Sequence, residues 1–356
     1  MGKIILDCDL MRFKNSGLHH YCLNLGIYVQ KILDKKWKDK ISFYVPAAEA
    51  HLFGPQANCI VEKTWHNRLF NPFLWDCDIW HAPFQSGKII PMDNKRIKVL
   101  LTVHDLNSLH EPLRPEDRIE NLAKTQKLID RADAIVCISN TTRNDVINNM
   151  EVANKPVYVI HNGTHDVMAP PEKPSGYMPQ RPFLFTMGYI NRKKNFHTLV
   201  PMLANPRLEL VIAGKLDDEN YIAEMEKTAA MMGVTDRLHV LGPVSEADKA
   251  WYLRHCEAFC LPSLAEGFGA PVVEAMSFGK PIFLSNLTSL PEIGADAAFY
   301  FKNFEPDHML EIYQAGMKIY TETNLRERII ERSSEFSWEK SAQQYVNVYH
   351  SMLINK

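Results

Sequence analysis

The sequence has no long hydrophobic run and no excess of one charge, and each absence excludes a class of protein. No stretch approaches the roughly 18–20 uninterrupted apolar residues that a membrane-spanning helix needs. The forty Lys and Arg residues are balanced by forty-two Asp and Glu residues, which gives a formal net charge of -2. A nucleic-acid-binding surface needs an excess of positive charge, so we expect no nucleic-acid partner.

We expect no secretory leader, and the cysteines show no paired spacing. The apolar run near the N-terminus ends at Asp7 and is too short for the core of a signal peptide. Seven cysteines are scattered at positions 8, 22, 59, 77, 137, 256 and 260. Scattered thiols are typical of a reducing compartment, so we expect a cytoplasmic protein.

What is present is the composition of a folded α/β protein. Of the 356 residues, 46% are hydrophobic and 23% are charged. Short aliphatic runs alternate with helical patterns, which predicts parallel sheets with crossover helices. The predicted strands cover residues 4–6, 41–45, 97–103, 134–138 and 157–160, and then 183–187, 208–213, 238–241, 258–261 and 281–284.

Prolines interrupt this alternation near the middle of the chain. Five of them, together with Gly176, fall between residues 170 and 182. Such a segment propagates neither helix nor sheet, so we expect a linker at 169–182 between doubly wound, Rossmann-like domains at 1–168 and 183–335. Ligands of doubly wound sheets bind at the carboxyl ends of the strands, and we expect the site there and in a cleft between the halves.

The most informative segment runs from Glu266 to Glu274 and directly follows the predicted strand 258–261. Two carboxylates flank a glycine-rich turn, and Pro271 favours a helix that starts near Ala270. Amides at a helix start attract anions, and carboxylates accept hydrogen bonds from hydroxyls. This pattern suits a nucleotide sugar, in which phosphates join two polyol parts. The alternative is an ordinary strand–turn–helix with a glutamate that compensates the helix dipole.

Three consecutive cations, Arg192, Lys193 and Lys194, lie just beyond the predicted strand 183–187, in a loop that begins at Gly188. At the end of a strand, they would neutralise a diphosphate leaving group as its charge develops. The alternative interpretation is a solvated basic loop.

Two further candidates lie in the first half of the chain. His104 follows the predicted strand 97–103, where its ring or its carbonyl would contact the transferred group. Gly17 lies in a loop that enters a helix, where backbone amides would bind phosphate or shape an acceptor pocket. The alternatives are a structural histidine and a plain helix N-cap.

Several common motifs are missing. The sequence contains neither a helix-opening G-x-G-x-x-G after its first strand nor a G-x-x-x-x-G-K-[ST] loop. The D-x-D triplets at 7–9 and 76–78 have no further metal ligands beside them. Cys256 and Cys260 are spaced as on one turn of a helix, but no second pair completes a zinc site. We expect no metal and no bound cofactor.

In these residues the sequence resembles the retaining glycosyltransferases of family 4. The segment from Glu266 to Glu274 matches that family's E-x-seven-E signature, and the loop from Gly188 to Asn195 is similar to its Gly-x-x-x-x-[RK]-K-N loop. The resemblance covers nearly the whole chain and implies the GT-B fold of two facing Rossmann-like domains. Residues 336–356 resemble the family's terminal helix, which crosses back to the first domain.

The resemblance also implies roles for individual residues. Glu266 would contact the donor sugar hydroxyls, Lys194 the diphosphate, and His104 the transferred sugar. Further donor-site residues implied by the resemblance are Gly188, Lys193, Val244, Gly267, Phe268, Gly269 and Glu274. Among these, Glu274 would bind the ribose and Val244 would lie near the base. Two departures are that Arg192 replaces a proline frequent in the family and that the Gly17 loop lacks a double glycine.

The implied function is transfer of a hexose from a nucleotide diphosphate sugar to a glycan or lipid-linked acceptor in polysaccharide or glycoconjugate synthesis. The resemblance implies retention at the anomeric carbon, no essential metal, and GDP-mannose as the first donor to test. Two alternatives stay open: a GT-B sugar-nucleotide epimerase or phosphorylase, and a non-catalytic subunit that binds nucleotide sugars.

Two segments leave peripheral contact with the inner face of the cell membrane open as a possibility. Residues 35–38 are basic around Trp37, and residues 65–75 combine Arg68 with four aromatic side chains. Such a surface would meet an anionic leaflet or a lipid-linked acceptor. The alternative is a charged helix end followed by a partly buried loop.

Overall fold

The computed structural model describes residues 2–14, 16–36, 40–63, 74, 76–85, 90–111, 113–164 and 171–354. The chain forms two compact units, Met1–Gly163 with Ser337–Lys356, and Thr164–Phe336. The predicted domain limits at 168, 183 and 335 stay predictions. The predicted membrane-facing segments lie largely outside the described residues.

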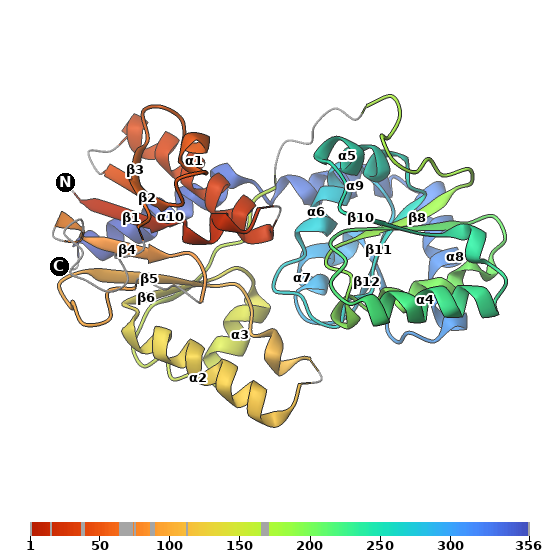
Figure 1. The fold of residues 1–356 in the computed structure, drawn as a ribbon, viewed down its shortest axis with the longest axis horizontal. Helices are drawn as coiled ribbons and strands as arrows, with labels where there is room; N and C mark the ends of the chain where they lie inside the picture. Colours follow the sequence, from red (N-terminus) through yellow and green to blue (C-terminus); the bar gives the residue numbers. More distant parts are fainter. Residues whose placement is uncertain are drawn as a thin grey trace. The chain divides into compact units, whose positions relative to one another are not determined.

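The first unit is built on a parallel sheet with the strand order β3-β2-β1-β4-β5-β6-β7 (Figure 1). Its strands are β1 (Lys3–Asp7), β2 (Lys40–Val45), β3 (Asn58–Val61), β4 (Ile79–Ala82), β5 (Lys98–Val103), β6 (Ala134–Cys137) and β7 (Val157–Val159). Its α-helices are α1 (Gly17–Lys36), α2 (Pro115–Arg131), α3 (Asn140–Asn149) and α10 (Trp338–Ile354).

Alternation along β1 divides the core of the first unit between the two faces of the sheet. Ile4 and Leu6 pack in one apolar cluster with residues of α1 and α10, while Ile5 packs in a second cluster with residues of α2 and α3. Successive side chains of a strand point to opposite faces, so a strand covered by helices on both faces is apolar throughout. The last helix of the chain therefore completes the core of the first unit.

The second unit has a parallel sheet in the order β10-β9-β8-β11-β12-β13 (Figure 1). The strands are β8 (Phe183–Met187), β9 (Glu209–Ala213), β10 (Leu238–Gly242), β11 (Ala258–Leu261), β12 (Ile282–Ser285) and β13 (Phe299–Phe301). The α-helices are α4 (Glu219–Met231), α5 (Glu246–His255), α6 (Ala270–Ser277), α7 (Leu290–Gly294), α8 (Pro306–Glu322) and α9 (Leu325–Ser334).

Two parallel-sheet, Rossmann-like units are the predicted architecture, but three strands were not predicted. The short strands β3 and β13 lie at sheet edges, and β4 carries His81 between apolar residues. Cys256 and Cys260 do not share a helix, because Cys256 follows α5 and Cys260 lies in β11. None of the helices in the described part of the chain is long and apolar enough to span a membrane.

Candidate functional site

The turn after β11 has the geometry that its glycines and proline predict. Helix α6 begins at Ala270, with Pro271 in its first positions, and Gly269 before it has a φ of 100°. A residue with a side chain is strained at this φ, which explains the glycine. The helix ends before Gly279, whose φ is 66°. Glu266 thus lies in the loop, and Glu274 lies on the helix.

Hydrogen bonds from the segment before α7 hold the backbone of this loop. The amide of Glu266 donates to Oγ1 of Thr288 at 2.9 Å. The hydroxyl of Ser289 bonds to the carbonyl of Glu266 at 2.9 Å and to that of Phe268 at 3.0 Å. Because Ser289 is fully buried, these bonds fix the position from which the Glu266 side chain extends.

The side chain of Glu266 forms an ion pair with Lys194. Nζ of Lys194 lies 2.6 Å from Oε1 of Glu266, and the two side chains are only 13% and 12% exposed. A β-carbon on Gly188 would lie 3.0 Å from Cε of Lys194, so this glycine leaves room for the lysine. The amide of Leu264 also donates to the carbonyl of Lys193, which ties the two loops together.

Arg192 does not join Lys194 in facing Glu266. Its guanidinium pairs with Glu224 on α4 and lies over the ring of Tyr221, and its side chain is mostly exposed. The three consecutive cations are therefore not one cluster. Of Arg192 and Lys194, it is Lys194 that faces the signature glutamate.

Glu274 has a partner that the sequence analysis missed. Nζ of Lys249, on α5, lies 3.3 and 3.2 Å from the two carboxylate oxygens of Glu274 and 2.7 Å from Oε2 of Glu246. Burial disfavours the ammonium, but the two carboxylates outweigh it and raise the pKa of Lys249. Glu246 and Lys249 are three residues apart on one helix, but this spacing predicts only their own contact and not the one with Glu274.

Glycines end three neighbouring strands of the second unit. Gly188, Gly214 and Gly242 follow or end β8, β9 and β10, and all three have positive φ values. A β-carbon on Gly214 would overlap the carbonyl oxygen of Gly188, and the amide of Gly214 donates to Gly242 at 2.8 Å. This close packing leaves the carboxyl edge of the three strands without bulky side chains. Val244, half-buried, follows this edge and directly precedes the N-cap of α5.

His104 is buried at the end of β5 in the first unit. Its Nε2 donates to the carbonyl of Pro83 at 2.7 Å, and its ring packs edge-to-face against Tyr21 and Phe84. Burial lowers the pKa of His104 to about 4, so the ring is neutral at pH 7. With Nε2–H engaged by a carbonyl, the ring is poorly suited to act as a general acid.

Gly17 is the first residue of α1, and the hydroxyl of Ser16 accepts a hydrogen bond from the amide of His19 at 3.1 Å. Ser16 thus caps the N-terminus of α1. This local geometry is the one that the alternative interpretation, a plain helix N-cap, describes. A β-carbon on Gly17 would meet no atom within 4 Å. The first turns of α1 carry Tyr21, which connects this segment to His104.

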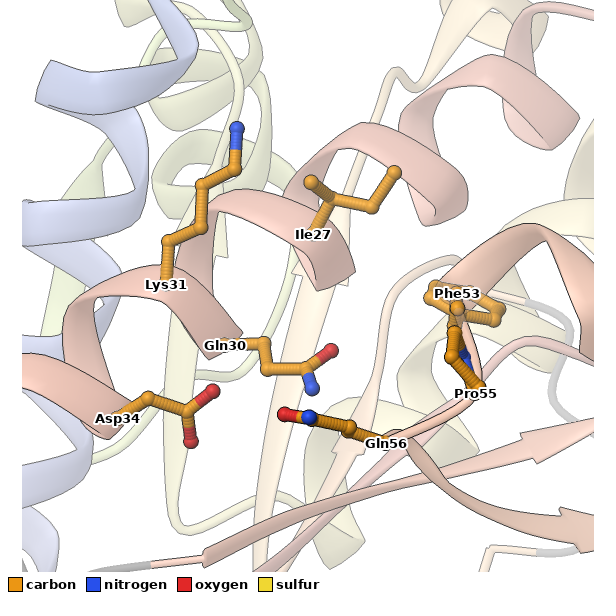
Figure 2. Close-up of a pocket in the computed structure, with 8 residues that line it drawn as sticks. Ile27, Gln30, Lys31, Asp34, Phe53, Pro55 and Gln56 are labelled. Atoms are coloured by element: carbon orange, nitrogen blue, oxygen red, sulfur yellow. The ribbon is translucent and has the colours of Figure 1, made fainter.

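A hollow of about 290 Å³ lies in the first unit between α1 and the segment around Phe53 (Figure 2). The amides of Gln30 and Gln56 extend into the same space, and Lys31 and Asp34 stand at its rim. None of the predicted site residues lines it. Within the described ranges, no group of three or more His, Cys, Asp or Glu side chains is placed to hold a metal ion.

Solved structures resemble this chain over its whole length. A sucrose-phosphate synthase from Thermosynechococcus elongatus matches with a TM-score of 0.79 at 16% identity, and the match covers 100% of both chains. Anabaena HepE, solved in complex with UDP and glucose, matches with a TM-score of 0.76 at 16% identity, over 99% of this chain and 100% of that one. These likenesses establish the GT-B fold.

Among curated proteins, the O-antigen chain mannosyltransferase B of Escherichia coli is 27% identical over 276 residues, which are 71% of this chain and 70% of that protein. The serotype-specific mannosyltransferase WbdA of Escherichia coli is 28% identical over 281 residues, 71% of this chain. The match spans only 33% of WbdA.

Two family models match consecutive parts of the chain. The model described as Glycosyltransferase Family 4 matches residues 51–166, and the model described as Glycosyl transferases group 1 matches residues 172–336. The second match contains Lys194, Glu266 and Glu274. With the GT-B fold around both matches, the chain belongs to glycosyltransferase family 4.

Proposed function

We propose that this glycosyltransferase transfers a hexose from a nucleotide diphosphate sugar to a glycan or lipid-linked acceptor, with retention at the anomeric carbon and without an essential metal. The observation that carries the proposal is the ion pair of Lys194 and Glu266 at the carboxyl edge of the second sheet. A cation for a diphosphate and a carboxylate for sugar hydroxyls are the two groups that a nucleotide sugar requires at its reacting end.

The proposed binding mode divides the donor between the two glutamates. The ammonium of Lys194, assisted by Lys193, binds the diphosphate, and Glu266 binds the sugar hydroxyls. Gly188 and the backbone from Gly267 to Gly269, with Phe268 between them, admit the phosphates and sugar close to the chain. Glu274 binds the ribose, and Val244 lies near the base.

The ion pair supports a role for Lys194 that strengthens in the transition state. A cation beside the departing diphosphate is worth most when the glycosidic bond breaks and the leaving group gains charge. In the proposed reaction, the acceptor hydroxyl attacks on the same face through an oxocarbenium-like state, and the departing diphosphate takes its proton. His104, neutral and bonded to Pro83, lies beside the transferred sugar and takes no part in proton transfer.

GDP-mannose is the first donor that we propose, and a polysaccharide precursor is the acceptor class. The support is that the curated relatives include mannosyltransferases, among them one that acts on O-antigen chains by its name. HepE, with UDP and glucose in its structure, supports a nucleotide sugar in general and makes UDP-glucose the second donor to test.

A thermal-shift screen identifies the donor. Purified protein is heated with UDP-, GDP-, ADP- and TDP-sugars, with and without EDTA, because a ligand that binds the native state raises its melting temperature. We expect one nucleotide to give a selective shift that survives EDTA and weakens in Glu274→Ala. No shift with any sugar nucleotide or nucleotide diphosphate would contradict the proposed donor site.

A product assay separates transfer from the alternatives. Nucleotide diphosphate release should require an acceptor and fall by about 10²–10³-fold in Glu266→Gln, while Glu322→Gln, on the exposed end of α8, stays at the wild-type rate. An epimerase would convert the donor without acceptor, and a phosphorylase would require inorganic phosphate. A non-catalytic subunit would bind the donor and release no product.

A further inference from the structure

Lys249 connects two helices at the nucleoside end of the proposed donor site. It extends from α5 to Glu274 on α6, at 3.3 and 3.2 Å from the two carboxylate oxygens, and also contacts Glu246 one turn earlier on its own helix. The side chains of Lys249 and Glu274 are only 17% and 20% exposed, whereas that of Glu246 is 54% exposed. The ammonium is thus held between an inner carboxylate and an outer one.

This arrangement is a costly way to join two helices. Ordering a lysine side chain costs conformational entropy, and partial burial removes water from both charges. An apolar side chain on α5 would fill the same space without these costs. A half-buried ion pair in such a position is therefore better explained by what it does to the carboxylate than by stability.

What the ion pair does is restrict the Glu274 side chain. One ammonium faces both carboxylate oxygens, so it limits the rotation of the carboxylate. The backbone of Glu274 is fixed as well, since its carbonyl accepts a hydrogen bond from Ser277 at 2.7 Å. Lys249 contacts the carboxylates of both Glu274 and Glu246, so it also reduces the repulsion between them.

We propose that Lys249 is a positioning residue, which holds the Glu274 carboxylate in the orientation that accepts hydrogen bonds from the two ribose hydroxyls of the donor nucleotide. The inference rests on the proposed function, because it needs a nucleotide at this site. Lys249 touches neither the sugar nor the phosphates in this scheme. Its effect is specific to ligands that carry the ribose hydroxyls.

The test compares a ribonucleoside diphosphate with its 2′,3′-dideoxy counterpart by titration calorimetry. The base is the one that wild-type protein prefers among GDP, UDP and ADP. The variants are Lys249→Met, Lys249→Arg and Glu274→Gln, with Lys227→Met on the exposed face of α4 as the matched control. Thermal melts check that each variant is folded, and Lys249→Gln replaces Lys249→Met if the latter does not fold.

We expect wild-type protein and Lys227→Met to bind the ribose form about tenfold more tightly than the dideoxy form. In Lys249→Met and Glu274→Gln this ratio should fall to near one, with the dideoxy affinity unchanged, and Lys249→Arg should restore most of it. Combining Lys249→Met with Glu274→Gln should cost nothing further, because both remove the same contact.

Two results would overturn the inference while leaving the proposed function intact. One is that Lys249→Met keeps the wild-type preference for the ribose form over the dideoxy form. The other is an equal loss of affinity for both ligands in Lys249→Met, which would mean that the lysine acts on the phosphates by charge alone. If wild-type protein binds none of the three nucleotides, the proposed function itself fails, and the inference fails with it.

Discussion

At the scale of single residues, two cations of one loop differ in what they contact. Lys194 is largely buried and pairs with Glu266, whereas Arg192 is exposed and pairs with Glu224 on α4. Exposed ion pairs contribute little to stability, because solvent screens them. Cations two positions apart in the sequence are therefore expected to affect the proposed reaction differently.

Substitution of each cation by methionine tests this difference. Lys194→Met should lower the rate of nucleotide diphosphate release by at least about 100-fold, since it removes a cation from the leaving group. Arg192→Met should stay within about threefold of wild type. The measurement is the initial rate with saturating donor and acceptor. Equal losses in both variants would contradict the assignment of Lys194 as the diphosphate residue.

Two buried histidines make the stability of the first unit depend on pH. Burial lowers the pKa of His81 to about 3 and that of His104 to about 4, from a usual value of 6.5. Between pH 6.5 and about 4, the unfolded chain therefore binds more protons than the folded one. The free energy of unfolding should fall as the pH falls through this range, by up to about 1.4 kcal/mol per pH unit for each histidine.

Urea unfolding of the first unit at pH 5, 6, 7 and 8 measures this dependence. The midpoint should depend less on pH in His81→Gln than in wild type. Tyr349→Phe is the matched control, because it removes the hydrogen bond between the tyrosine hydroxyl and Nδ1 of His81 and keeps the titrating group. A pH dependence unchanged by His81→Gln would show that His81 is not its source.

At the scale of elements, the carboxyl edge of β8, β9 and β10 depends on backbone packing. Gly214 and Gly233 both have positive φ, at 141° and 67°, so a side chain strains both. They differ in their neighbours. A β-carbon on Gly214 would overlap the carbonyl oxygen of Gly188, whereas a β-carbon on Gly233 would meet no atom within 4 Å. Gly214 is also next to the loop that carries Lys194.

Alanine substitutions at these two glycines distinguish the free-energy cost of backbone strain from that of an overlapping β-carbon. Gly233→Ala should cost about 1 kcal/mol from backbone strain alone, and Gly214→Ala about 2–4 kcal/mol with a loss of donor affinity. Urea unfolding of the second unit and donor titration are the measurements. A Gly214→Ala variant that binds donor as wild type does would show that the strand edge is not part of the donor site.

At the scale of the whole molecule, the first unit contains both ends of the described chain. The buried side chains of α10 pack in the same cluster as those of β1 and α1. Polar contacts inside this core join Tyr345 to Tyr21 at 2.6 Å and Tyr349 to His81 at 2.7 Å. Because buried polar groups cost free energy unless they are paired, these contacts restrict how α10 can sit on the sheet.

Truncation of one α10 side chain should therefore destabilise the first unit selectively. Tyr349→Ala removes a fully buried aromatic ring and should cost about 3–5 kcal/mol, whereas Gln344→Ala, on the exposed face of the same helix, should cost almost nothing. Amide hydrogen exchange should show a loss of protection in residues 2–163 and no loss of protection in residues 171–336. Equal loss in both ranges would mean that the two units unfold together.

Much of the fold could be predicted from the sequence because strands covered on both faces have a local pattern. Strand β11 is a continuous apolar run and β8 is apolar except for Thr186, and the bounds of both equal the predicted ones. The start of α6 was likewise predicted from Pro271 and the glycines before it. By contrast, β4 contains His81, which is tolerated only because Thr102 and Tyr349 satisfy its two ring nitrogens.

By itself, the sequence determined the two parallel-sheet units, the turn from Glu266 to Glu274 and the family signature, since each depends on residues close together along the chain. Only the tertiary structure decided that Lys194, and not Arg192, faces Glu266, and that Lys249 faces Glu274. These pairs join residues 25 or more positions apart. Which charges meet depends on how strands and helices pack, and no local pattern contains that information.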